Sequence, residues 1–213
     1  LKAEWFPPIM KKAEAQELAE RAYPLHPTAL VMLPYLFKRL AQNERSLFAY
    51  LASHEPAGFQ EFLHRRTLGD FISLPELFDY LVANFQGRLF ASGRARLITE
   101  TLERLTSAPS LEPNEIRLVK TIGLLGWLAE VSHLLATEDR IISALRADNF
   151  SEKEIRQILQ KLQAQSLIVY RRFNQTFMVW QGSDVDIEAQ LAIARQKLTG
   201  AFSLAETVQL HLP

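Results

Sequence analysis

The sequence predicts a mainly α-helical protein, in which a helical bundle is followed by three more helices and a small β-hairpin. Three observations carry this prediction. Apolar residues recur at helical spacing along most of the chain up to about residue 165. The stretch 106–114, rich in Ser, Thr and Pro, interrupts this pattern. Beyond it, the final apolar segment changes to the two-residue alternation of strands.

The first half of the chain contains the signals of several short helices. Residues 11–23 are rich in Ala, Glu and Lys, which favour helices. Two prolines in YPLHPT end that helix, and Thr28 is expected to cap the next one, with His26 helping to terminate the first. Further helices are predicted at 29–41, 43–54, 56–66, 74–85 and 92–105.

The second half has a different order of elements. Three helices are predicted at 115–131, 137–147 and 151–167, then a hairpin over 167–181 with a tight turn at Asn174 and Gln175, and a last helix at 186–198. Three helices followed by a hairpin is the order of a winged helix-turn-helix. The predicted division is therefore a helical domain at 1–109, a winged-helix domain at 112–182, and a C-terminal helix and tail at 183–213.

Composition and charge narrow the classes of function. Lys plus Arg and Asp plus Glu are equal at 24 each, which argues against a surface built entirely for nucleic acid or acidic membrane. The chain has no cysteine, which fits a reducing compartment, and no apolar run long enough to span a bilayer. We therefore expect a cytoplasmic protein without a membrane partner.

No residues in the chain form a recognisable catalytic or cofactor site. There is no Gly-Lys dipeptide and hence no P-loop, and the five histidines lack the spacing of metal ligands. We predict no catalytic residues, no metal site and no cofactor for this chain. Gly123 and Gly126 lie within an apolar helix, where close helix packing is the expected reason for them.

The predicted winged helix offers five candidate contacts for nucleic acid or a protein partner. Glu152 and Glu154 share the first turn of the last of its helices, and Lys plus Arg exceed Asp plus Glu only slightly between 113 and 181. This balance favours a protein contact over DNA but leaves both open. The candidates are Lys153, Arg156 and Lys161 on the helix and Arg171 and Arg172 beside the hairpin turn.

Two stretches carry a resemblance to a known family. The segment YPLHPTALVMLPYLFKRLAQNERSLFAYL resembles the helical lid that follows the nucleotide-binding core in large bacterial P-loop ATPases of the AAA+ and STAND type. The segments RLVKTIGLLGWLAE and SLIVYRRFNQTFMVWQGSDVDIEAQLAIAR resemble the winged helix that closes the same module, as in origin-recognition-type ATPases and relatives linked to phage defence. The resemblance spans about residues 20 to 195.

The resemblance implies a role for Arg45. In the family, an arginine at the start of a lid helix senses the γ-phosphate of the bound triphosphate, and Arg45 matches that position. The P-loop, the Walker B acid and the preceding core are missing from this chain. The resemblance therefore implies a non-catalytic part of a larger ATPase, whose upstream nucleotide-binding domain would hold ATP and Mg²⁺. An exposed ion pair of Arg45 with Glu44 or Glu55 is the alternative.

Two other classes of function stay open at this point. The chain could be a free-standing winged-helix DNA-binding regulator, with residues 26–109 as a ligand or dimerisation domain. It could also be a protein-binding adaptor, which an exposed apolar patch would favour.

Overall fold

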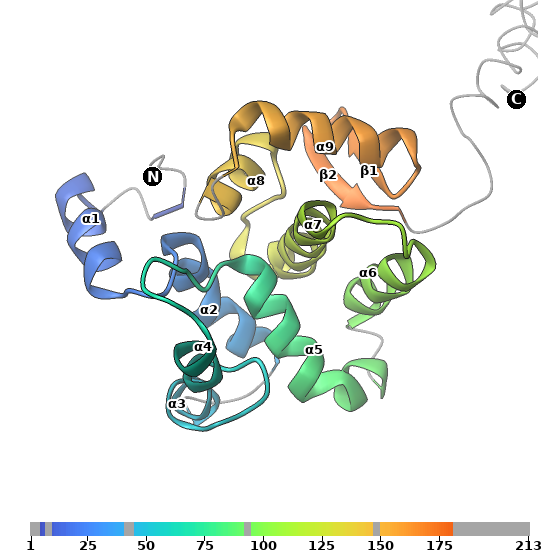
Figure 1. Cartoon of the computed structure of the whole chain (residues 1–213). Coiled ribbons are helices and arrows are strands. Elements are labelled where there is room, and N and C mark those ends of the chain that lie inside the picture. The colour runs from blue at the N-terminus through green and yellow to red at the C-terminus, as the bar shows by residue number, and fades with distance from the viewer. Residues whose placement is uncertain (1–4, 7–9, 41–44, 92–94, 147–149, 181–213) are drawn as a thin grey trace, which may run out of the picture. The chain divides into compact units, whose positions relative to one another are not determined.

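The fold is mainly helical with one small two-stranded antiparallel sheet, as predicted (Figure 1). The structure, a computed structural model, describes residues 5–6, 10–40, 45–91, 95–146 and 150–180. The helix predicted at 186–198 lies outside them. The elements are α1 (Lys12–Arg21), α2 (Pro27–Arg39), α3 (Arg45–Ala52), α4 (Phe59–Arg65), α5 (Leu74–Ala91), α6 (Arg96–Ser107), α7 (Pro113–Ser132), α8 (Glu138–Leu145), α9 (Glu152–Ala164), β1 (Ile168–Arg171) and β2 (Thr176–Val179).

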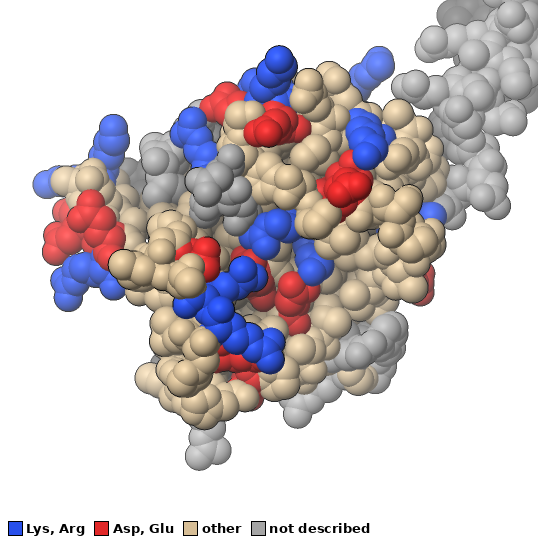
Figure 2. Space-filling model, in the orientation of Figure 1, with Lys and Arg blue, Asp and Glu red and all other residues tan. Residues whose placement is uncertain are grey.

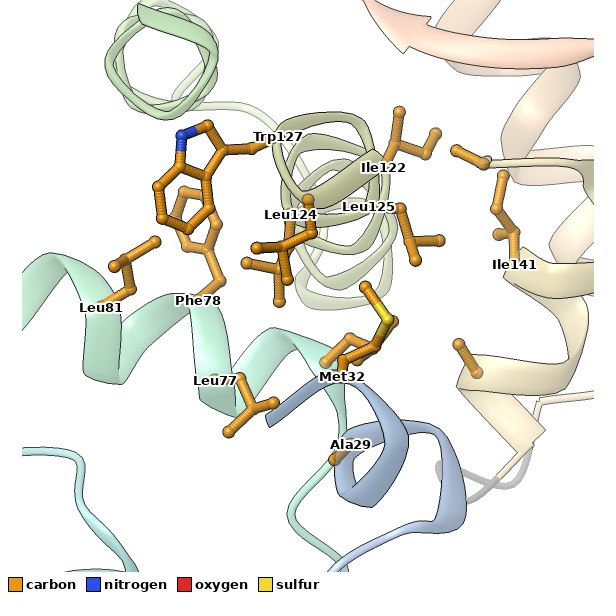
Figure 3. Close-up of a cluster of buried hydrophobic side chains, with 14 of the residues drawn as sticks. Ala29, Met32, Leu77, Phe78, Leu81, Ile122, Leu124, Leu125, Trp127 and Ile141 are labelled. Carbon is orange, nitrogen blue, oxygen red and sulfur yellow. The ribbon is translucent and has the colours of Figure 1, made fainter. Parts of the chain in front are cut away.

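Helix α7 is the centre of the fold. It contacts α2, α5, α6, α8, α9 and β2, and its side chains are buried around most of its circumference. Figure 3 shows α7 end-on, with Trp127 and Leu124 directed toward α5 and Ile122 on the side of Ile141 of α8. A helix that is apolar on all sides must be covered on all sides. Helices from both sides of the stretch 106–114 provide that cover, and the predicted domain division stays a prediction.

Gly123 allows α6 and α7 to pack closely. A methyl group at Gly123 would lie 2.7 Å from Cγ2 of Thr101, a buried residue of α6. The hydroxyl of Thr101 donates to the backbone carbonyl of Leu97, which holds the side chain in place. A methyl group at Gly126, one turn along α7, would meet no atom within 4 Å. The packing reason expected from the sequence thus applies to Gly123 and does not apply to Gly126.

This difference gives a matched pair of variants. We expect Gly123→Ala to lower the free energy of unfolding by about 2 kcal/mol, because the added methyl overpacks the contact with Thr101. Gly126→Ala should raise it by about 0.5 to 1 kcal/mol through helix propensity alone. Urea unfolding of both variants measures the two changes. Thr101→Ala should recover part of the loss in Gly123→Ala, and equal effects of the two alanines would contradict the close contact.

His26, and not Thr28, caps α2. The Nδ1 atom of His26 accepts a hydrogen bond from the backbone N–H of Thr28 at 3.4 Å, and Pro27 is the first helical residue. The prediction that Thr28 caps this helix was wrong, because the cap lies one residue before the proline. His26 is buried, and its backbone N–H donates to the carbonyl of Ile72, which ties the start of α2 to the segment before α5.

Burial of His26 makes the stability of the fold depend on pH. It lowers the pKa of His26 from 6.5 to about 4, so protonation favours the unfolded chain. The contribution of His26 to the free energy of unfolding is fully present above pH 6.5. It is lost as the pH drops from 6.5 to 4, by about 3 kcal/mol in all. His26→Asn retains a good cap and should remove the loss between pH 6.5 and 4.5 in urea unfolding. The same slope in both proteins would contradict this assignment.

An ion pair joins α5 to α7. Glu76 accepts hydrogen bonds from the backbone N–H and the hydroxyl of Ser73, the residue before α5. Arg117 of α7 donates to both carboxylate oxygens of Glu76, at 2.6 and 3.2 Å, and to the Ser73 hydroxyl at 3.0 Å. Burial opposes ionisation of Glu76, but the hydrogen bonds and charge of Arg117 outweigh it and hold its pKa below the usual value. Arg117 therefore fixes α7 on the first turn of α5.

The segment between α7 and α8 pairs with the hairpin. The backbone N–H of Phe177 in β2 donates to the carbonyl of Ala136 at 2.9 Å, and Thr137 forms an antiparallel bridge with Thr176. Strands β1 and β2 pair in register from Ile168 with Val179 to Arg171 with Thr176. The hairpin is thus held on one edge by the connection that leads into α8.

Candidate nucleic-acid interface

Helix α9 presents one apolar face to the core and one polar face to solvent. Ile155, Leu159 and Leu162 are buried at helical spacing against α7. Ser151 caps the helix, and Glu154 completes the capping box by accepting hydrogen bonds from the backbone N–H and the hydroxyl of Ser151. The outward face is polar and comprises Lys153, Arg156, Gln157, Gln160, Lys161 and Gln163.

The three predicted cations of α9 have different surroundings. Lys153 is exposed and has no acidic partner among the described residues. Arg156 donates to Glu138 at 2.7 Å and lies 3.6 Å from Glu152, with about half of its side chain exposed. Lys161 forms an ion pair with Glu115, at the start of α7. Of the three cations, Lys153 is therefore the one whose charge is not paired with an acidic side chain among the described residues.

The pair of Lys161 and Glu115 has a structural role. Glu115 is buried and completes the capping box of α7 by accepting from the backbone N–H of Glu112. Burial opposes ionisation of Glu115, but the hydrogen bonds from Lys161 and from the Glu112 backbone hold its pKa below the usual value. Lys161 thus ties α9 to α7, in the same way that Arg117 ties α7 to α5.

The hairpin turn is longer than predicted and has two exposed arginines at its start. Residues 172–175 form the turn, so Arg172 and Phe173 lie at its tip and not in a strand. The prediction of a two-residue turn was wrong. Arg171 and Arg172 are both exposed, and neither has a hydrogen-bond or ion-pair partner within the part of the chain that the structure describes. The Phe173 side chain is 82% exposed.

Three acidic side chains at or near the start of α9 have ion-pair or hydrogen-bond partners. Glu138 pairs with Arg156, and Glu152 pairs with Arg146 at 3.2 Å as well as with Arg156. Hydrogen bonds from Ser151 hold the pKa of Glu154 below the usual value. Figure 2 shows basic and acidic side chains intermingled over α9. Repulsion of a polyanion by Glu138 and Glu152 is reduced because each pairs with an arginine, whereas Glu154, bonded to a neutral serine, keeps its full charge.

Arg45 is the first residue of α3, but its side chain lies outside what the structure describes. The resemblance also implies that Arg45 lies at the mouth of a groove lined by helices 29–41 and 43–54. Residues 41–44, between these helices, lie outside the described residues as well. The sensing role of Arg45 therefore stays a prediction.

A second charged region lies between α4, α5 and the start of α7. It is a hollow of about 420 Å³, partly lined by Phe62, Ile72 and Ala83, and Figure 2 shows a band of basic side chains near α4. Arg66 lies 5.9 Å from the ring centre of Phe62 and has no acidic partner among the described residues. The other cations are paired at 2.6 Å, as Arg65–Glu61, Arg117–Glu76 and Lys120–Asp79. This neutralisation makes the hollow a weaker anion site than the hairpin turn.

Sequence reasoning missed Phe173 and the charges of the hollow. Phe173 fits the apolar alternation of a strand, and only the length of the turn places it at a tip. Arg65 and Arg66 belong to a predicted helix, but nothing local in the sequence indicates that Arg117 and Lys120 come close to them.

Comparisons of the chain with models of protein families, with curated proteins and with solved structures found no match. Among the described residues, no helix is long and apolar enough to cross a membrane. In the same residues, no group of three or more His, Asp or Glu side chains is arranged to hold a metal ion.

Proposed function

We propose that residues 113–180 form a winged helix that binds nucleic acid through α9 and the hairpin turn. The observation that carries this proposal is the pair of exposed arginines, Arg171 and Arg172, which lack acidic partners among the described residues. The order α7, α8, α9, β1, β2 supports it, as does the isolated bridge between the α7–α8 connection and β2, which lies where a winged helix has its short third strand.

The proposed binding mode follows from the positions of the charges. In a helix-turn-helix, the second helix enters the major groove with its N-terminal residues toward the bases. Here that helix is α9, and Lys153 lies in its first turn. The arginines of the turn then contact phosphates of the flanking backbone, as guanidinium groups do through paired N–H donors. Phosphate contacts give affinity without sequence preference, so random duplex is the first ligand to test.

Fluorescence anisotropy with a short random duplex at low salt tests the proposal. We expect a dissociation constant of about 1 to 100 µM at physiological salt, the range of non-specific duplex binding, and tighter binding at low salt. Absence of binding at low salt would contradict the proposal. Binding to a protein partner in that case would favour the adaptor alternative.

A second proposal concerns the first half of the chain. The resemblance to the lid of AAA+ and STAND ATPases requires a helix directly after the Tyr-Pro-x-His-Pro segment and an arginine at the start of the next helix. In the structure α3 begins at Arg45, and α2 before it is capped by His26 of that segment. These positions support a lid whose partner is an upstream nucleotide-binding domain with ATP and Mg²⁺. In this proposal the winged helix and the lid are parts of one larger bacterial ATPase.

Arg45→Ala in the complete ATPase tests this second proposal. We expect ATP hydrolysis to fall about tenfold or more, because the guanidinium would stabilise charge on the γ-phosphate. Arg45→Lys should restore little, since an ammonium does not reproduce the planar fork. Folding should be nearly unaffected, which thermal unfolding of both variants would verify. Unchanged turnover in Arg45→Ala would contradict a sensing role.

A further inference from the structure

Phe173 is a large apolar side chain held away from the core. With 82% of its surface exposed, it is more accessible than Phe48, at 66%, and it has no ring contact with any described residue. Leu68 is still more exposed, at 94%, but its neighbours differ. Near Leu68, Arg65 pairs with Glu61 and Arg66 lies over the ring of Phe62, so one cation there lacks an acidic partner among the described residues. Beside Phe173, both Arg171 and Arg172 lack an acidic partner among the described residues. The hairpin turn thus combines an exposed apolar side chain, Phe173, with two arginines that have no acidic partner among the described residues.

Contacts within the hairpin fix the backbone that carries Phe173. Tyr170 packs on Phe177 across the strands, with ring centres 4.9 Å apart. In the turn itself, Thr176 and Asn174 share a hydrogen bond of 2.7 Å. The pairing of Thr176 with Thr137 anchors the same end of the hairpin to the start of α8. Because the strands and the turn are fixed, little conformational entropy is lost when the tip contacts a ligand.

We propose that Phe173 is a wedge that inserts between stacked bases of bound DNA, so that the hairpin turn prefers a mismatched or otherwise weakly stacked step. This inference rests on the proposed binding of nucleic acid. A phenyl ring that directly follows two arginines combines an apolar face for bases with charge for neighbouring phosphates. Proteins that kink DNA insert phenylalanine between base steps in this way, with basic residues alongside.

The inference predicts which DNA is bound more tightly. Inserting a ring between paired and stacked bases requires that they unstack, and this is easier where pairing is already lost. A duplex with one central mismatch should therefore bind more tightly than the matched duplex of the same sequence. The preference should depend on Phe173, whereas the affinity common to both duplexes should depend on Arg171 and Arg172.

The test uses two short duplexes, one matched and one with a central mismatch, each carrying 2-aminopurine beside the central step. We expect the wild-type protein to prefer the mismatch by about tenfold and to raise the 2-aminopurine fluorescence, because the base is unstacked. Phe173→Ala should bind both duplexes equally without the rise in fluorescence, and Phe173→Trp should retain both effects. Phe48→Ala, which removes another exposed ring, should behave as wild type.

The possible results distinguish failure of the wedge proposal from failure of the proposed nucleic-acid binding. Equal, salt-dependent binding of both duplexes by wild type and Phe173→Ala, without a rise in fluorescence, would overturn the wedge and leave nucleic-acid binding in place. Failure to bind either duplex at low salt would overturn both. Self-association that is lost in Phe173→Ala, without any DNA binding, would assign the residue to a protein interface and would also overturn the wedge.

Discussion

Replacing Arg117 by methionine is expected to lower the free energy of unfolding by about 3 kcal/mol. The substitution removes both hydrogen bonds to Glu76 and one to Ser73, and it leaves the carboxylate of Glu76, whose side chain is only 16% exposed, without its cation. Breaking a largely buried ion pair on one side is costly because the remaining charge is desolvated and unpaired. Urea unfolding at neutral pH measures the change.

Two further variants identify the cause. Glu76→Gln keeps an acceptor for the Ser73 backbone N–H and removes the charge, so adding it to Arg117→Met should recover part of the lost stability. Arg156→Met removes an exposed ion pair with Glu138 and should change stability by no more than about 1 kcal/mol. Equal losses in Arg117→Met and Arg156→Met would contradict the role of Arg117 in joining α7 to α5.

The second large effect is expected at the hairpin turn. Arg171→Ala combined with Arg172→Ala should weaken binding to random duplex about tenfold or more, because two guanidinium contacts with phosphate are lost. Both side chains are exposed and unpaired among the described residues, so the fold should be retained, and thermal unfolding checks this.

The matched control removes two other exposed cations. Lys12, on α1, and Arg66, after α4, likewise have no acidic partner among the described residues. Lys12→Ala combined with Arg66→Ala changes the net charge by the same amount but should leave the affinity nearly unchanged. An equal loss of affinity in both double variants would mean that net charge, and not the hairpin turn, determines binding.

The mainly helical fold with its hairpin could be predicted because the local signals are strong. The capping box of Ser151 and Glu154 marks the start of α9, and Pro113 and Pro75 lie in the first turns of their helices. Errors arose where two signals competed. Thr28 is a better N-cap type than His26, but Pro27 is favoured at the first helical position, so the histidine takes the cap.

The candidate site was harder to predict, because it depends on pairing between distant residues. Lys153, Arg156 and Lys161 look equivalent along α9, yet only Lys153 has its charge available. The partner of Lys161 is Glu115, on α7, and the partner of Arg156 includes Glu138, on α8. Periodicity indicates which face of a helix is exposed but gives no information about the charges that lie opposite it.

Two glutamates near helix starts, Glu76 and Glu115, explain how the candidate interface is supported. Glu76 at the start of α5 binds Arg117 of α7, and Glu115 at the start of α7 binds Lys161 of α9. Each carboxylate accepts a hydrogen bond from the backbone N–H of the residue before its own helix and holds a cation from a later one. The polar face of α9 is therefore fixed relative to the central helix, as a helix presented to a groove requires.

Salt dependence of duplex binding is the most direct test of the central claim, that α9 and the hairpin turn form a nucleic-acid interface. Association constants measured from about 50 to about 200 mM salt should fall steeply for the wild type, because each neutralised phosphate releases counterions. The double variant Arg171→Ala with Arg172→Ala should reduce the slope by about two, roughly one for each phosphate contact. The control of Lys12→Ala with Arg66→Ala should keep the wild-type slope. A flat dependence in the wild type, or an unchanged slope in the hairpin variant, would contradict the interface.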